Sequence, residues 1–136
     1  MNAPRIPYNF AVLRVVPHVF TGAFVNVGVI LHAPTAQHLD MRVLHDLDSL
    51  RERVADVDLD LLVKYLRSCE DVSRGEESAG PVALLPPSER FHWLTAPRSD
   101  VIQCSPIHGG LATDLDAELE ALYRSYVAEG TRPLRP

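Results

Sequence analysis

The chain has 136 residues, 46% of them hydrophobic and 23% charged, which is the composition of a soluble globular protein of one-domain size. A formal net charge of −5 with scattered Lys and Arg argues against binding nucleic acid through its phosphates. No apolar run approaches the roughly 20 residues of a membrane helix. The first residues carry no signal-peptide pattern, and two cysteines are too few for a disulfide framework or a thiolate zinc site. We therefore expect a cytosolic protein that binds neither nucleic acid nor membrane, and we assign it no cofactor.

The predicted fold is organised around a strand at residues 23–32. Its sequence, AFVNVGVILH, is apolar on one face and is interrupted on the other by Asn26, Gly28 and His32. A strand that is apolar on both faces is typical of the middle of a sheet covered on both sides. Residues 8–16 predict its hairpin partner, because a Pro- and Gly-containing loop joins the two segments.

The register of this hairpin predicts a polar site. A slip of one residue would reverse every side chain, so the apolar faces should match. That register groups two sets of apolar residues on one face: Ala11, Leu13 and Val15 with Val25, Val27 and Val29. It places Arg14 on the other face with Asn26 and Gly28, among Tyr8, Phe10, Phe24 and Ile30. A buried charge needs a partner. Arg14 therefore either binds a carboxylate of this chain or, with Asn26 and the space left by Gly28, faces a ligand or a partner protein.

The middle of the chain predicts one more strand and two helices. Residues 39–43 alternate between apolar and polar and predict a third strand, antiparallel to the central one. Asp46 or Asp48 begins a short helix, and Asp58 begins a longer one whose apolar residues recur at helical spacing. The polar, Gly-containing segment 73–81 is expected to be a mobile loop.

The last third predicts two helices around a short strand. A short helix covers residues 86–94, a fourth strand covers 101–104, and residues 105–113 form a loop. Thr113 or Asp114 caps the last helix, which ends at Gly130 and whose apolar stripe contains Leu115, Leu119, Leu122 and Tyr126.

Together these elements predict a single α+β domain over residues 1–136. Its sheet is small and mostly antiparallel, with about four strands that begin as an N-terminal meander. Helices pack against the sheet, and the tail at 131–136 is expected to be frayed.

Two separated motifs carry a family resemblance. The segments VLRVVP and FVNVGVIL in the first hairpin, and RFHWLTAPRS and IQCSPIHGGL later, resemble the Domain of Unknown Function 3037 family of bacterial proteins. The likeness extends from about Tyr8 to Val127. Two positions depart from the pattern: Ala23 stands where we expect an acidic residue, and Asp100 stands where we expect a hydroxyl residue, so each change weakens a polar contact of the family. Members are thought to lie beside genes for HipA-like serine/threonine kinases, so the resemblance implies a protein partner.

The resemblance also singles out a polar run in the second half of the chain: Arg98, Ser99, Gln103, Ser105, His108 and Asp114. Ser105, His108 and Asp114 are the residue types of a nucleophile, a base and an orienting acid, with Cys104 as another nucleophile. The same residues could instead form a network that fixes the loop to the sheet. An anion site at the glycines before the last helix is opposed by the three acids in that helix's first turns.

The six histidines predict no metal site, since none pair at a helical or strand ligand spacing. His32 and His38 flank a turn and give only a weak candidate.

Two functions follow from these patterns. The first is a protein-interaction module, in which Arg14, Asn26 and Gly28, or the segment with Arg98, Ser99, Gln103 and His108, docks a partner. The second is a small hydrolase or nucleotide-handling enzyme that uses Ser105, His108 and Asp114, with Arg14 or Arg98 on an anion. The first is our leading expectation, because no catalytic spacing accompanies the polar and aromatic residues.

Overall fold

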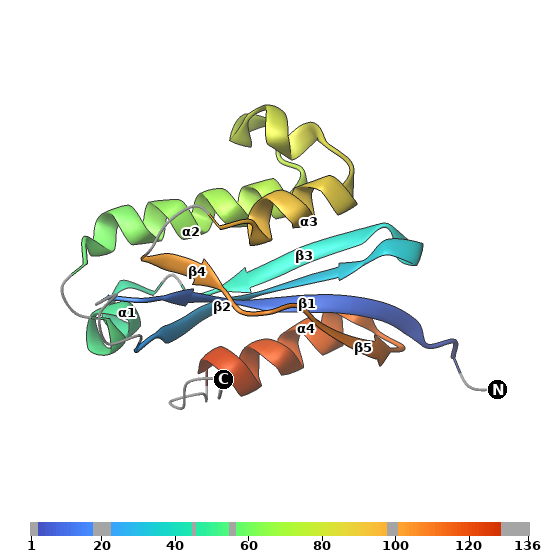
Figure 1. The fold of residues 1–136 in the computed structure, drawn as a ribbon, viewed down its shortest axis with the longest axis horizontal. Helices are drawn as coiled ribbons and strands as arrows, with labels where there is room; N and C mark the ends of the chain where they lie inside the picture. The colour runs from blue at the N-terminus through green and yellow to red at the C-terminus, as the bar shows by residue number, and fades with distance from the viewer. Residues whose placement is uncertain (1–2, 18–22, 45, 55–56, 98–100, 129–136) are drawn as a thin grey trace.

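The computed structural model describes residues 3–17, 23–44, 46–54, 57–97 and 101–128, and within them the chain forms a five-stranded sheet with helices on both faces (Figure 1). The strands are β1 (Ile6–Val15), β2 (Val25–Ala33), β3 (His38–Val43), β4 (Ile102–Cys104) and β5 (His108–Ala112). The α-helices are α1 (Leu47–Arg53), α2 (Leu59–Arg74), α3 (Pro87–Thr95) and α4 (Leu115–Tyr123). The strand order is β3-β2-β1-β4, with β5 also paired to β1, and each pairing is antiparallel. The predicted α+β class and antiparallel sheet are confirmed.

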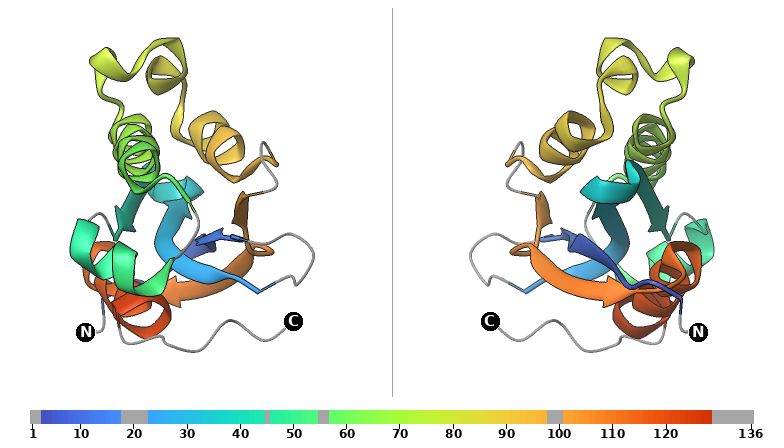
Figure 2. Two further views of the ribbon diagram at one scale, coloured as in Figure 1. Left: turned by 90° about the vertical axis from the view of Figure 1, so that its left-hand side faces the viewer. Right: turned by 90° about the vertical axis from the view of Figure 1, so that its right-hand side faces the viewer.

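Each face of the sheet has its own hydrophobic core. On one face α2 and α3 cover the sheet, and on the other face α4 does (Figures 1 and 2). The first core contains Leu13, Val27, Ile30, Met41, Val43, Leu62 and Leu66. The second contains Tyr8, Phe10, Val12, Val29, Leu31, Leu119, Tyr123 and Val127. This double cover explains why β2 is apolar on both faces, as its sequence predicts.

A β-bulge changes which residues of β2 share a face. Leu13 pairs with Gly28 and Arg14 pairs with Asn26, so Val27 is an extra residue between the two pairs. Val27 is fully buried in the core under α2. Because residues directly opposite in a ladder share a face, Gly28 lies on the α2 face with Leu13, and not with Asn26.

The bulge corrects the face assignment. Val25 and Val27 lie toward the α2 core with Leu13 and Val15, as predicted, but Val29 packs in the α4 core. Ile30 packs in the α2 core, so its predicted place beside Arg14 is wrong. The sequence argument assumed an uninterrupted period of two, and one inserted residue breaks it.

The segment predicted to be a loop at 105–113 contains a fifth strand. His108–Ala112 forms β5 and pairs with Ile6–Phe10 of β1. A Cβ on Gly110 would lie 2.5 Å from the Tyr8 hydroxyl oxygen, so the missing side chain is what admits the Tyr8 ring beside the strand. The Tyr8 hydroxyl donates a hydrogen bond to the Glu118 carboxylate of α4. Gly110 therefore serves sheet packing.

The helix starts confirm the sequence reading. Asp46, Asp58 and Asp114 are the N-caps of α1, α2 and α4, and each carboxylate accepts a hydrogen bond from the backbone N–H three residues later.

Two details around the helix ends differ from the sequence reading. α2 continues to Arg74, and short 3-10 turns follow at Glu77–Ala79 and Pro81–Leu84, so much of the predicted loop at 73–81 is helical. α4 continues into a π-helical turn, Arg124–Ala128, so that Tyr123 and Val127 are buried in its last turns. The predicted helix end at Gly130 and the tail at 131–136 lie outside the described residues.

Candidate functional site

Three of the predicted binding residues lie side by side across the sheet. Arg14 of β1 is directly opposite Asn26 of β2 and, on its other side, directly opposite Gln103 of β4. Opposed residues share a face, so all three point to the α4 side. The predicted shared face of Arg14 and Asn26 is confirmed, and Gln103 joins them through a pairing between distant parts of the chain. We call these three residues the polar row.

The Arg14 guanidinium is incompletely paired within the part of the chain that the structure describes. Its Nε is buried without a hydrogen bond, and no carboxylate of the described residues forms an ion pair with it. Its guanidinium carbon lies 4.2 Å from the centre of the Phe24 ring, which is a cation–π contact. Burial lowers the pKa of the Arg14 guanidinium from its usual value, although arginine remains charged in proteins. The expectation that Arg14 binds a carboxylate of this chain is not met within the described residues.

The Asn26 amide is only partly hydrogen-bonded. Its side-chain N–H donates to the Tyr126 carbonyl in the π-helical turn at 3.0 Å, which fixes the orientation of the amide. The Oδ1 atom is buried without a partner, and the residue is only 5% exposed. A buried unpaired donor or acceptor costs roughly 1–3 kcal/mol, so the polar row contains two costly atoms, one on Arg14 and one on Asn26.

His108 extends the same face away from the polar row. It pairs with Phe10, and its ring lies 5.4 Å from the Phe10 ring. The Tyr126 ring lies 5.8 Å from the Phe10 ring, so an aromatic strip joins β5 to the end of α4. His108 is exposed, and it lies on the face of the polar row opposite Phe10, four residues from Arg14 along β1.

The other predicted binding residues do not join the polar row. Gly28 lies on the opposite face, where a Cβ would come within 2.9 Å of Val43 Cγ1. Its predicted role as open space beside Arg14 is therefore wrong. Arg98 and Ser99 lie outside the described residues.

The three residues of the enzyme hypothesis have separate structural tasks. The Ser105 hydroxyl accepts a hydrogen bond from the Val12 N–H at 2.9 Å and donates to the Pro106 carbonyl at 2.8 Å. Asp114 caps α4, and His108 stacks on Phe10. Among the described residues no hydrogen bond links Ser105, His108 and Asp114, whereas a nucleophile and its base need one. Cys104 directs its thiol to the Leu94 carbonyl.

His32 has partners of its own. His32 stacks on Phe91 with ring centres 4.9 Å apart, and its Nε2 lies 3.3 Å from the Ser88 hydroxyl. Burial lowers the pKa of His32. Over the described residues, no group of three His, Cys, Asp or Glu side chains is arranged to hold a metal ion. Nor does any helix there combine the length and apolar composition that a membrane span requires.

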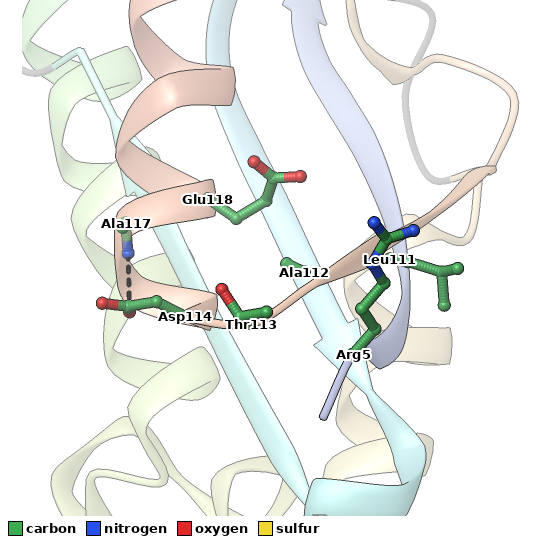
Figure 3. Close-up of a pocket in the computed structure, with 7 residues that line it drawn as sticks. All are labelled: Arg5, Leu111, Ala112, Thr113, Asp114, Ala117 and Glu118. Atoms are coloured by element: carbon green, nitrogen blue, oxygen red, sulfur yellow. Dashed lines mark hydrogen bonds between the residues drawn. The ribbon is translucent and has the colours of Figure 1, made fainter. Parts of the chain in front are cut away.

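A hollow of about 530 Å³ lies where β5 meets the start of α4 (Figure 3). Arg5 lies on one side of it, and the carboxylates of Asp114 and Glu118 lie on the helix side. The Asp114 carboxylate is already committed to the Ala117 N–H, and Glu118 accepts from Tyr8. Two carboxylates at the helix N-terminus oppose anion binding, which agrees with the sequence argument.

The comparison with protein families decides the membership of this chain. The model of the family described as "Protein of unknown function (DUF3037)" matches residues 10–127. The chain belongs to the DUF3037 family. The match covers all five strands except the first residues of β1, and it contains the complete polar row. No curated protein and no solved structure matches the chain.

Sequence reasoning missed one contributor to the site and the position of another. The Tyr126 carbonyl reaches Asn26 from the π-helical turn, which residue spacing does not reveal. The position of Gln103 beside Arg14 depends on pairing between β1 and β4, about 90 residues apart, and only the shared family motifs pointed to it.

Proposed function

We propose that this DUF3037 protein is a cytosolic interaction module that docks a partner protein on the α4-side face of the sheet, at Arg14. The observation that carries the proposal is the Arg14 guanidinium, whose buried Nε has no hydrogen bond and which forms no ion pair with a carboxylate of the described residues. A charged side chain that has lost part of its hydration without gaining a partner is destabilising in the free protein. An arriving partner that supplies the missing acceptor would recover that free energy in the complex.

The surroundings of Arg14 suit a protein surface. The polar row is flanked by half-buried aromatic residues, with the Phe24 ring against the guanidinium and Tyr126 beside Asn26. Arg and aromatic residues are the side chains that contribute most to protein interfaces. In contrast, the hydroxyl of Ser105 and the carboxylate of Asp114 are committed to the backbone, so no observation favours the hydrolase hypothesis.

The first partner to test is the one implied by the family resemblance, a HipA-like serine/threonine kinase. The tagged chain is expressed in its native host, and the proteins it retains are identified by mass spectrometry. The interaction is then rebuilt from the purified chain and the candidate kinase. We expect Arg14→Glu to lose at least about tenfold in affinity, because the reversed charge repels the acceptor that Arg14 binds.

The matched control is Arg51→Glu. Arg51 is exposed and forms only a surface ion pair with Asp48, so its reversal makes the same change in net charge away from the polar row. Arg51→Glu should bind as the unaltered chain does. A partner that Arg14→Glu retains with unchanged affinity would refute docking at Arg14.

A further inference from the structure

We infer that the group which the Arg14 site accepts is a carboxylate, presented by an acidic side chain of the partner. This inference rests on the proposed docking function and specifies its chemistry. Three features of the polar row lead to it: its charge, the shape of the guanidinium, and the two buried atoms that lack hydrogen bonds.

The polar row carries a single positive charge. The residues directly opposite Arg14 on both neighbouring strands, Asn26 and Gln103, are neutral amides. A carboxylate carries one negative charge, so Arg14 alone neutralises it. A phosphate group carries close to two negative charges at neutral pH and is bound in proteins by clustered cations or by several backbone N–H groups. The row offers neither, and the chain as a whole is acidic.

The shape of the guanidinium suits a planar acceptor. One side of it packs on the Phe24 ring, with its central carbon 4.2 Å from the ring centre. A planar guanidinium matches a carboxylate with two parallel N–H···O hydrogen bonds, and such a pair is shorter and stronger than a neutral hydrogen bond. Partial burial strengthens it further, because nearby water competes less for the ions.

The two unpaired buried atoms can satisfy each other. Arg14 Nε is a donor and Asn26 Oδ1 is an acceptor, and they belong to directly opposed residues. The Tyr126 carbonyl holds the other end of the Asn26 amide, so Oδ1 keeps its place. A hydrogen bond from Nε to Oδ1 in the complex would leave the two terminal N–H₂ groups as a fork for the incoming carboxylate. Asn26 is thus a positioning residue for Arg14.

Gln103 allows the inference to be tested by supplying the ligand within the chain. It is exposed and directly opposite Arg14, where cross-strand side chains come within contact distance. In Gln103→Glu the terminal amide becomes a carboxylate, and the side chain keeps its length and shape. It would pair with Arg14 and compete with an external carboxylate.

The experiment follows the ¹⁵N-labelled full chain by NMR during titration with three probes. These are the blocked peptide acetyl-Leu-Glu-Leu-amide, its neutral analogue acetyl-Leu-Gln-Leu-amide, and inorganic phosphate at matched ionic strength. We expect the Glu peptide to shift the backbone amides of Arg14, Asn26 and Gln103 and the side-chain Nε–H of Arg14, with saturation. Its affinity should exceed that of the Gln peptide by about tenfold or more.

The variants separate a specific site from general attraction. Arg14→Gln and Gln103→Glu should each weaken binding of the Glu peptide by about tenfold or more, although Gln103→Glu should be at least as stable as the unaltered chain. Arg51→Gln should leave the affinity unchanged. Equal affinity for the Glu and Gln peptides, tighter binding of phosphate, or full binding by Gln103→Glu would each overturn the carboxylate inference.

The outcome also distinguishes this inference from the docking proposal. If a partner is captured through Arg14 while the Glu peptide does not bind, the docking proposal stands and the carboxylate inference is wrong. If the Glu peptide binds at Arg14 while partner capture does not depend on Arg14, the docking proposal alone fails.

Discussion

Replacing Gly110 with Ala tests how β5 and α4 are joined to the sheet. An added Cβ at this position would lie 2.5 Å from the Tyr8 hydroxyl oxygen and 2.6 Å from Tyr8 Cζ. The backbone of Gly110 does not adopt a positive φ, so alanine is conformationally acceptable and only space opposes it. Tyr8 is buried, and its ring would have to move away from the strand, which breaks the hydrogen bond to Glu118.

The expected loss of stability combines two terms. Overpacking a well-packed core costs about 1–3 kcal/mol, and a hydrogen bond to a charged group contributes about 1.5–3 kcal/mol. Alanine returns about 0.4–1 kcal/mol by restricting the unfolded chain. We therefore expect Gly110→Ala to lower the free energy of unfolding by about 2–5 kcal/mol, a large part of the total stability of a domain this size.

Urea unfolding followed by circular dichroism measures this difference. The matched control is Gly109→Ala, because a Cβ on the neighbouring glycine would meet nothing closer than 3.8 Å. We expect the urea midpoint of Gly110→Ala to fall by about 1 M or more relative to Gly109→Ala. Equal midpoints for the two variants would refute the role assigned to Gly110, which is to leave space for the Tyr8 ring beside β5.

Three further predictions concern buried polar groups. Burial is the main cause, and the hydrogen bond to Glu118 the second, of a rise in the pKa of Tyr8 from 10.0 to about 12. The protonated hydroxyl therefore stabilises the fold below pH 10, and this contribution is lost between pH 10 and 12. Tyr8→Phe should flatten that part of the curve of stability against pH. Burial lowers the pKa of His32 below 6.5, so the unfolded state binds the proton more tightly and stability should fall as the pH drops below about 6.5; His32→Gln should remove this fall, and an unchanged slope would contradict the assignment. Arg90 donates hydrogen bonds to three backbone carbonyls, two at the end of α2 and one just before α3. Arg90→Ala should therefore lower the free energy of unfolding by about 2–4 kcal/mol. In the same urea assay, Arg67→Ala, at an exposed position of α2, should lower it by less than about 0.5 kcal/mol.

The parts of the fold that were predictable from the sequence are those with local causes. Asp46, Asp58 and Asp114 begin their helices because a short carboxylate side chain can accept from the N–H three residues later, whatever the rest of the chain does. The first hairpin was predictable because its two apolar segments and intervening loop are adjacent in sequence.

The parts that were missed depend on contacts between distant segments. Gly109 and Gly110 disfavour a strand by their own propensity, and they form one by pairing with β1, about 100 residues earlier, where the Tyr8 ring occupies the space beside Gly110. The contact of the π-helical turn with Asn26 and the pairing of Gln103 with Arg14 were also missed because each joins segments that are far apart in the sequence. For the candidate site, matching of apolar faces was sufficient to place Arg14 with Asn26, but Gly28 was misplaced because alternation does not reveal an inserted residue.

The extra residue in β2 also determines which changes in chain length the protein can absorb. If Val27 were deleted, Gly28 would still pair with Leu13 and Asn26 with Arg14, so the site would keep its geometry at the expense of one core side chain. A deletion between Gly28 and Ala33 would instead reverse the orientation of every side chain on one side of the gap. Insertions and deletions among DUF3037 proteins should therefore be found at the bulge and be rare in the six residues after it.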